Sequence, residues 1–485
     1  MRVFRQSKTA LKLVPPPPLG HRRSSPIFGA ATQLRGGAFG VDSFTGNTLN
    51  VWNYTGSAVN GVDNFQFLNF VLPASLKGLE VSGAATLGDG AGRDSTVTGV
   101  SIVGGAAPVQ VGQSVTLIDG NIAGNLSSTQ ASGQHGATLL YNWTLTTPAA
   151  GGLVATVNNV QADPKAKALS EGFLSGLALV NQGADLVAGK GITDATNAAK
   201  KSVATQGAGT NYGFGTFGAI SGGWSKYNTG SHVDVSGLSL IAGLSFGADV
   251  APGRLTLGAF FEYGTGSYDS YNSFATDIHG KGNIYHLGGG ILGRMDFVDT
   301  GPGNFYAEVS ARTGGAYNEY NSDDLRDAMG RKASYDTYAP YYGIHAGLGY
   351  IWKFTEKASL DLHAKYFWTR QQGDSVTLST GDPVKFKDVD SHRLRLGGRF
   401  AYAINDYVSP YIGAAWEYEM DGRARATTYG YDMDSPSLYG STGIGELGVT
   451  LKPSKDLPLS FDLGVQGYVG KREGVTGSLQ IRYEF

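Results

Sequence analysis

The chain has 485 residues, more than one ordinary domain needs, and its length suggests two or three domains. Its formal net charge of -2 and its pI near 6.5 argue against a polyanionic partner such as nucleic acid. The absence of cysteine excludes disulfide frameworks, thiolate nucleophiles and zinc-thiolate sites, and it is compatible with export into an oxidising compartment.

Residues 1–37 combine the run Pro15–Pro18 with arginines and glycines, a composition that predicts disorder. In residues 38–163, short alternating runs are bounded by Gly and Asn turn signals. Brief strands at short intervals are typical of a parallel β-helix, in which each rung buries one face on its neighbour. We therefore predict a short right-handed parallel β-helix fragment there, with a small β-sandwich as the alternative.

An amphipathic helix is predicted from Pro164, a residue suited to a first helical turn. Apolar residues then recur at three- and four-residue steps: Ala166, Leu169, Phe173, Leu177, Val180, Ala184 and Val187. The remaining positions are small or polar, so a helical linker over 164–204 is slim enough for a narrow, partly polar lumen. Periodicity alone leaves open a helix packed on the outside of a soluble domain.

From 205 to 485 the chain is richer in aromatic residues and alternates apolar and polar residues with a period of two. Twelve segments show this pattern: 213–226, 234–248, 253–268, 280–298, 303–318, 335–353, 358–371, 386–404, 407–421, 438–451, 457–470 and 473–485. Arg393, Arg395 and Arg399 occupy one face of a strand whose other face is apolar. Lipid outside and a wet lumen inside accommodate both faces. We predict a 12-stranded antiparallel transmembrane β-barrel with the helical linker in its pore, in an all-β fold.

Connection lengths alternate as well, and in such barrels short turns face the periplasm and long loops face outward. The long connections cover 269–279, 319–334, 373–385 and 422–436. Aromatic residues near strand ends are assigned to the two interfacial girdles: Tyr341, Tyr342, Tyr350 and Trp352. No run of roughly 18 apolar residues is present to cross a bilayer as a helix.

Strand parity assigns seven charged side chains to the lumen: Glu262, Glu308, Arg393, Arg395, Arg399, Glu417 and Glu419. We interpret Glu417 and Glu419 as negative charges that balance the arginines across the pore, in preference to a general acid/base pair.

Residues 216–227 (TFGAISGGWSKY), 230–235 and 252–255 resemble the translocator domain of the autotransporter family (type V secretion). The alternating C-terminal residues resemble the signal that delivers outer-membrane barrels to their assembly machinery: Leu479, Ile481, Tyr483 and Phe485. The resemblance covers about 165–485. It implies an outer-membrane barrel plugged by a helix, and an N-terminal passenger that crosses C-terminus first.

The resemblance also implies partners: outer-membrane lipid, the barrel assembly machinery, periplasmic chaperones, and host surface molecules bound by the passenger. It implies no cofactor. The N-terminus has a basic start but lacks the apolar core and cleavage site of a signal peptide. Because an exported protein needs such a signal, we expect that the reading frame starts late or that the gene has lost its front.

Some members of the family cut themselves beside an Asn pair in the linker, and Asn158 and Asn159 precede the helix. Their flanking sequence does not match the cutting subfamily, so a turn between β-helix and helix is the favoured interpretation. The loop Gly88–Ser95 lacks the strand, elbow and helix of a serine nucleophile. His135 has no acid partner in its vicinity, and the eight histidines lack metal-ligand spacing. We expect no enzyme in this chain.

The leading hypothesis is a transport protein that displays its passenger at the bacterial surface, where the passenger serves adhesion. The alternatives are a passive outer-membrane channel, and the remnant of a larger autotransporter whose upstream passenger was an enzyme.

Overall fold

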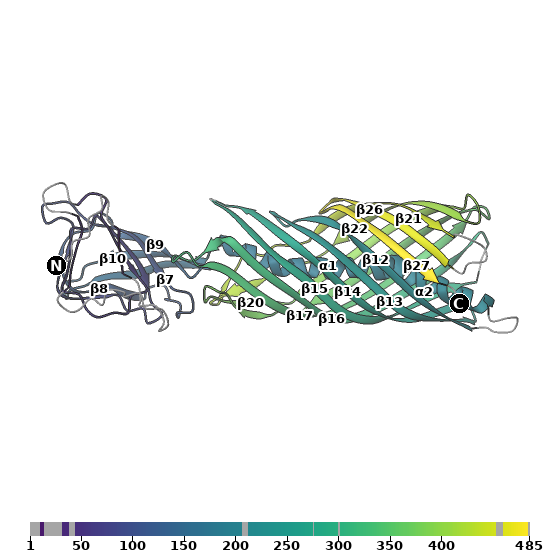
Figure 1. Ribbon diagram of the computed structural model, residues 1–485, viewed down its shortest axis with the longest axis horizontal. Helices are drawn as coiled ribbons and strands as arrows, with labels where there is room; N and C mark the ends of the chain where they lie inside the picture. Colours follow the sequence, from purple (N-terminus) through teal and green to yellow (C-terminus); the bar gives the residue numbers. More distant parts are fainter. Residues whose placement is uncertain are drawn as a thin grey trace.

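The computed structural model describes residues 10–13, 32–37, 44–205, 212–274, 276–298, 301–452 and 459–483. An N-terminal domain of short strands is followed by a helix that runs into a long β-barrel (Figure 1). The N-terminal domain lies beyond one end of the barrel (Figure 1).

Eleven strands build the N-terminal domain: β1 (Ala10–Leu13), β2 (Gln33–Arg35), β3 (Thr48–Trp52), β4 (Gly61–Asp63), β5 (Phe67–Leu72), β6 (Leu79–Leu87), β7 (Thr96–Ile102), β8 (Ser114–Gly124), β9 (Gln130–His135), β10 (Leu139–Thr146) and β11 (Leu153–Ala162). Strands β1, β3, β5, β7 and β9 pair in parallel, as do β2, β4, β6 and β8. The antiparallel hairpin β10–β11 joins the two rows at β9 and β8. Two parallel rows closed by one hairpin enclose a core in which Tyr141 and Trp143 are fully buried.

Strands β1 and β2 lie within residues 1–37, for which composition predicts disorder. Their backbones pair with β3 and β4, and these pairings give 10–13 and 33–35 the order that composition alone does not indicate. Residues 1–9 and 14–31 of that segment lie outside the described part of the chain. The parallel pairing of the two rows also differs from the antiparallel pairing of a β-sandwich, the alternative considered above.

Twelve antiparallel strands form the barrel: β12 (Tyr212–Asn228), β13 (His232–Val250), β14 (Gly253–Ser273), β15 (Asp277–Phe297), β16 (Gly303–Arg326), β17 (Lys332–Lys353), β18 (Ala358–Gln371), β21 (Val389–Tyr402), β22 (Val408–Glu419), β25 (Gly440–Leu451), β26 (Leu459–Gly470) and β27 (Arg472–Tyr483). The first and last strands close the barrel with pairs that run from Ala219↔Gln480 to Tyr227↔Arg472. The predicted 12-stranded barrel is therefore confirmed, and each of the twelve predicted segments overlaps one of its strands.

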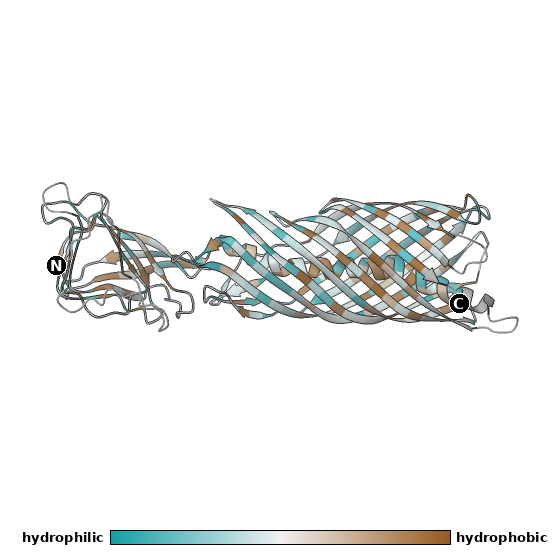
Figure 2. Cartoon of the chain, viewed as in Figure 1, coloured by the Kyte–Doolittle hydropathy of each residue, from teal (hydrophilic) through white to brown (hydrophobic). Residues whose placement is uncertain are grey.

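Buried and exposed residues alternate along the barrel strands. Hydropathy also changes repeatedly along these strands (Figure 2). Ile291, Leu348 and Leu447 are more than half exposed on the outer face. Tyr285, Tyr317 and Tyr338 form a row with neighbouring ring centroids 4.6 Å apart, the first pair stacked and the second tilted, and they mark the aromatic girdle nearer the N-terminal domain. Tyr341 does not join a girdle, because it is fully buried inside the barrel.

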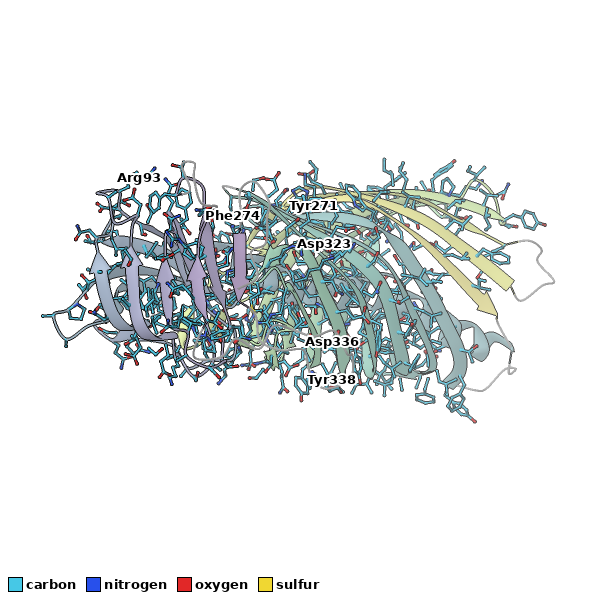
Figure 3. The ribbon with its side chains drawn as sticks, turned by 60° about the vertical axis from the view of Figure 1, so that its left-hand side comes forward. Arg93, Tyr271, Phe274, Asp323, Asp336 and Tyr338 are labelled. Atoms are coloured by element: carbon cyan, nitrogen blue, oxygen red, sulfur yellow. The ribbon has the colours of Figure 1, made fainter. Side chains whose placement is uncertain are left out.

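Two of the predicted long loops are largely strand, since β14–β15 and β16–β17 continue well beyond the girdle. These strands stay regular because their inner residues Tyr268, Tyr320 and Tyr335 pack together around the helix. Asp323 on β16 and Asp336 on β17 belong to this tall part of the wall (Figure 3).

The other two long connections contain four short strands that form a separate sheet in the order β19 (Ser375–Thr377), β20 (Pro383–Phe386), β23 (Ala426–Thr428) and β24 (Tyr431–Asp432). We call it the loop sheet. It stands above the short strands β18, β21, β22 and β25, and its strand β19 lies against β17.

The linker is helical as predicted, with a 3-10 turn over Pro164–Ala166, α1 over Lys167–Leu186, a π-helical turn over Val187–Gly191 and α2 over Ile192–Thr205. Asp163 caps its start by accepting a hydrogen bond from the backbone N–H of Lys165 at 2.9 Å. Among the described helices, none is both long enough and apolar enough to cross a bilayer.

Candidate functional site

The barrel lumen is occupied by the linker helix, whose residues Leu169, Phe173 and Leu177 are completely buried. Small residues allow this fit: a Cβ atom on Gly172 would lie 2.6 to 2.7 Å from the side chains of three barrel tyrosines. The helix therefore lies inside the barrel, and the alternative of packing on an outer surface is wrong. The slim face predicted for this helix is the property that lets the barrel close around it.

Asp185 of α1 is held by three guanidinium groups of the barrel wall. Its Oδ1 atom accepts hydrogen bonds from Arg393 and Arg395 at 2.7 Å each, and its Oδ2 atom accepts one from Arg472 at 3.2 Å. Arg393 and Arg395 lie on β21 and Arg472 on β27, and β22, β25 and β26 separate these two strands in the barrel. Asp185 thus ties the helix to two distant parts of the wall.

Glu417 completes this arginine cluster from the neighbouring strand β22, accepting hydrogen bonds from Arg395 at 2.5 and 2.9 Å and from Arg393 at 3.3 Å. The ring of Phe367 lies 4.7 Å from the guanidinium carbon of Arg393. Loss of one partner from such a buried cluster strongly destabilises the folded protein, because the remaining charge stays buried without its counter-charge.

Lys190 forms a second attachment, within the π-helical turn. Its ammonium donates hydrogen bonds to Asp462 and to the hydroxyl of Tyr411, both at 2.6 Å, and lies 3.9 Å from Glu446. A π-turn inserts one extra residue into a helix and occurs often at functional sites. Here it begins directly after the segment that carries Asp185.

Glu171 forms a third attachment near the N-terminal domain. Its carboxylate accepts hydrogen bonds from the hydroxyls of Thr229 (2.8 Å) and Ser231 and from the amide of Asn272, and Lys167 lies 3.3 Å away. Charged contacts are thus spread along the helix and fix both its height and its rotation in the lumen.

The seven charged residues assigned to the lumen all line it. Several of them pair with residues other than the arginines and carboxylates that were expected to face one another. Glu262 accepts from Arg312 at 2.9 Å, and Arg312 also donates to the Val180 carbonyl of the helix at 2.8 Å. Glu308 pairs with Lys365 at 2.7 Å, and Lys365 also donates to the Ala188 carbonyl at 2.7 Å. These pairs connect the wall to the backbone of the helix.

Arg399 pairs with Glu446, at 2.8 Å, and so belongs with the Lys190 attachment instead of the arginine cluster. Glu419 is the register partner of Arg393, although the described salt bridges do not join the two side chains. It accepts hydrogen bonds from the Ser391 hydroxyl and from the backbone N–H groups of His392 (2.8 Å) and Asp421 (3.0 Å), and so caps the end of its strand pair. Glu417 forms the salt bridges expected opposite the arginines, and Glu419 adds a second negative charge beside Arg393.

Asn158 and Asn159 lie on β11 outside the barrel. The side chain of Asn158 makes hydrogen bonds to Thr144 and Gln130 across the neighbouring strands, and the residue lies at a β-bulge of the β10–β11 pairing instead of in the predicted turn. Register makes Asn159 the partner of Asn142. The described hydrogen bonds of the Asn158 side chain join it to uncharged groups, and cleavage beside this pair stays the alternative considered above.

The remaining candidates are spread over the chain. Asp89 accepts hydrogen bonds from the backbone N–H groups of Ala91 and Arg93, which makes the loop Gly88–Ser95 a glycine-rich turn. Leu479, Ile481 and Tyr483 lie on β27, and their role as an assembly signal stays a prediction, while Phe485 lies outside the described residues. Within the described ranges, no group of three His, Asp or Glu residues has metal-binding geometry.

Several residues of the site were missed from sequence, above all Asp185, Lys190 and Arg472. A signal existed for two of them, since charged residues on a helix destined for a lumen require buried partners. The pair Arg395↔Glu417 is directly opposed in register, so correct strand alignment also predicts it.

The loop sheet covers the end of the lumen that faces the N-terminal domain. Phe386 of β20 stacks on Phe173 of α1 with ring centroids 4.6 Å apart, and Val384 and Ala426 join the same buried cluster. Helix and loop sheet together fill this mouth with apolar side chains.

The closed barrel and the helix anchored in its lumen place this protein in the class of helix-plugged β-barrels. The sequence model of the autotransporter beta-domain matches residues 216–464, and the chain therefore belongs to the autotransporter family. A search of curated proteins found no match.

Three solved structures similar to this chain come from the same family. The beta domain of the Bordetella autotransporter BrkA is 20% identical, covering 56% of this chain and 99% of that one with a TM-score of 0.42. The transport unit of AIDA-I from Escherichia coli is 18% identical, covering 60% and 97% with a TM-score of 0.42. The translocator domain of NalP from Neisseria meningitidis is 13% identical, covering 62% and 98% with a TM-score of 0.42.

Proposed function

We propose that this outer-membrane translocator anchors its N-terminal domain and displays it, as a passenger, on the cell surface. The observation that carries the proposal is the anchored linker: the chain leaves the passenger at Ala162 and passes through the lumen to β12 on the far side. A segment held at Glu171, Asp185 and Lys190 keeps the passenger attached at one mouth of the barrel.

The stacked parallel strands of the passenger support display, because each pair of strands adds buried surface next to the one already formed. Outside the membrane, such stepwise folding favours outward movement without any nucleotide. The β-helical description of the passenger, its right-handed sense and its use in adhesion are parts of this proposal.

A passive channel is the alternative, and it requires an open lumen. The buried helix and the apolar loop sheet at the mouth argue against it. Bilayer recordings on the purified chain separate the two functions, since a channel conducts steadily and an anchored plug keeps the barrel closed.

Display is tested by protease shaving of intact cells that produce the chain with an added export signal. An epitope tag at Ser57, in an exposed part of the passenger, should be removed while the barrel survives and keeps its heat-modifiable migration. A matched tag in the turn at Asn405, at the other end of the barrel, should stay protected. If the Ser57 tag is protected in cells with a folded barrel, display is refuted.

A further inference from the structure

A charged hollow lies between the linker and the wall at the barrel mouth farther from the N-terminal domain, which we call the far mouth. The hollow has a volume of about 510 Å³ and is bordered by the end of α2 and by the short turns after β13 and β15. The charged residues that line it are Lys200, Asp249, Arg254, Asp296 and Lys353. Three cations thus accompany two carboxylates.

The ion pairs within this hollow leave it with a net positive charge. Arg254 pairs with Asp249 at 2.6 Å and also donates to the Ala199 carbonyl of α2 at 2.9 Å. Asp296 is held at 2.9 Å by the buried Arg294, so Lys200, at 3.3 Å, is its second cation. The side chain of Lys200 is 43% exposed and can reach a further anion.

An apolar groove lies on the outer wall beside this hollow. It has a volume of about 630 Å³ and crosses β16, β17, β18 and β21. The outward-facing residues that line it include Phe297, Phe305, Leu348, Leu362, Ala364 and Leu396. Phe305 and Leu348 are more than half exposed on the face that meets lipid, so the groove is open to a hydrocarbon chain.

The hollow and the groove meet at one residue, because Phe297 lines both of them. Asn304 of the hollow also directly precedes Phe305 of the groove. Trp352 and Phe354 stack near this level with ring centroids 4.8 Å apart, as is typical of an aromatic girdle at a membrane interface. A molecule that fills both spaces needs an anionic end at the interface and an apolar chain in the membrane.

A second apolar groove of the outer wall shows what the charged hollow adds. It has a volume of about 670 Å³ and crosses the seam between β12 and β27. The residues that line it, among them Leu238, Leu447 and Leu463, are all uncharged. Such a groove can accept a hydrocarbon chain but gives no preference for a headgroup, whereas the groove beside Phe297 continues into a cationic space.

We propose that the far mouth binds a phospholipid with a net negative headgroup, whose phosphate lies against Lys200 and Lys353 and whose acyl chain lies in the groove beside Phe297. Charge complementarity selects the headgroup, and the groove selects a lipid over a free anion. Lys200 belongs to the linker and Lys353 to the wall, so the bound headgroup joins the plug to the barrel at this mouth. This binding site is additional to anchoring and display.

Two lysines provide the test of the headgroup contact. Lys200→Gln combined with Lys353→Gln removes two positive charges from the hollow, and it should weaken phosphatidylglycerol binding by about fivefold or more. Lys281→Gln combined with Lys332→Gln is the matched control. It removes two exposed lysines at the other end of the barrel and changes the net charge of the chain by the same amount.

Ala364 provides the test of the acyl chain contact. Ala364→Phe places a ring in the groove on the lipid-facing side, where a larger apolar side chain is compatible with the barrel wall. Ala259→Phe makes the same change at an exposed position of β14 that lines neither space. The first variant should lose the bound lipid, and the second should keep it.

The experiment measures lipid binding to the full chain by native mass spectrometry. The protein is delipidated in detergent micelles and titrated with phosphatidylglycerol, with phosphatidylcholine or with inorganic phosphate. Heat-modifiable migration verifies that every variant keeps its barrel. The parent chain should retain one phosphatidylglycerol at least about fivefold more tightly than phosphatidylcholine, and inorganic phosphate should not be retained.

Four results would overturn the proposal. Equal retention of both lipids, unaffected by the lysine changes, would mean unselective coating of the wall. Retention of phosphate with no effect of Ala364→Phe would mean an anion site that does not use the groove. A dimer would mean that a second copy of the chain covers the groove, and an absence of retained lipid would mean that the site is empty. Because the protein is purified, the result is independent of whether cells display the passenger.

Discussion

Replacing Asp185 by Asn tests how strongly the helix is locked in the lumen. The change keeps the shape of the side chain but removes the charge that faces Arg393, Arg395 and Arg472, which leaves Glu417 as the carboxylate in direct contact with the cluster. Removing one partner of a buried ion pair typically costs ~3–5 kcal/mol. At tenfold per ~1.4 kcal/mol, the population with the helix displaced should rise by about two to three and a half orders of magnitude.

Planar bilayer recordings measure this population directly, as the fraction of time in which a single barrel conducts. The parent chain should be almost always closed, and Asp185→Asn should show frequent open bursts together with a lower thermal unfolding midpoint. Asp249→Asn, which removes an exposed carboxylate at a turn, is the matched control and should behave as the parent. Closed recordings and an unchanged midpoint for Asp185→Asn would refute the view that this ion cluster holds the plug.

Three further predictions concern the passenger and the outer wall. Burial lowers the pKa of His135 from 6.5 to about 4. The passenger's free energy of unfolding should therefore be at its maximum above pH 6.5 and fall by about 3 kcal/mol as the pH drops to 4, because in this range the unfolded chain takes up a proton that the folded chain does not. Urea titrations of the parent chain and of His135→Phe at several pH values isolate the contribution of His135 to the free energy of unfolding. Protonation of the buried Asp382, whose pKa is raised by burial, should raise that free energy as the pH falls, by the same amount in both proteins, and so it cancels in the comparison. Leu447→Arg, at a 61% exposed position of the outer wall, should destabilise the barrel by ~2–4 kcal/mol in denaturant titrations, whereas Val111→Arg on the passenger surface should not. Trp143→Ala removes a fully buried ring and its hydrogen bond to the Val100 carbonyl, and hydrogen exchange should report a loss of ~3–5 kcal/mol confined to the passenger.

The barrel could be predicted from sequence because its physical signal is repeated in every strand. A wall between lipid and a polar lumen imposes a period of two, and the tight turns separate one strand from the next. The strand ends near the passenger were less predictable. There β14–β17 continue past the girdle because Tyr268, Tyr320 and Tyr335 pack around the helix. This contact joins residues that are far apart in the sequence, so the local alternation of apolar and polar residues does not predict it.

The loop sheet was missed for a related reason. Its strands have two to four residues, too few for a period to be recognised, and they form from two loops that are separated by β21 and β22. Within the lumen, parity identified which charges face inward. It did not identify their partners, because Asp185 lies more than 200 residues from Arg393 and Arg395.

The tall part of the barrel wall determines how far the passenger stands from the lipid. From Tyr317 in the girdle to Arg326 at the end of β16, the strand rises by ~3.3 Å per residue along a tilt of roughly 40°. The wall therefore extends about 20 Å beyond the lipid-facing aromatic ring. This clearance keeps the N-terminal domain, which stands beyond this end of the barrel, well above the lipid headgroups.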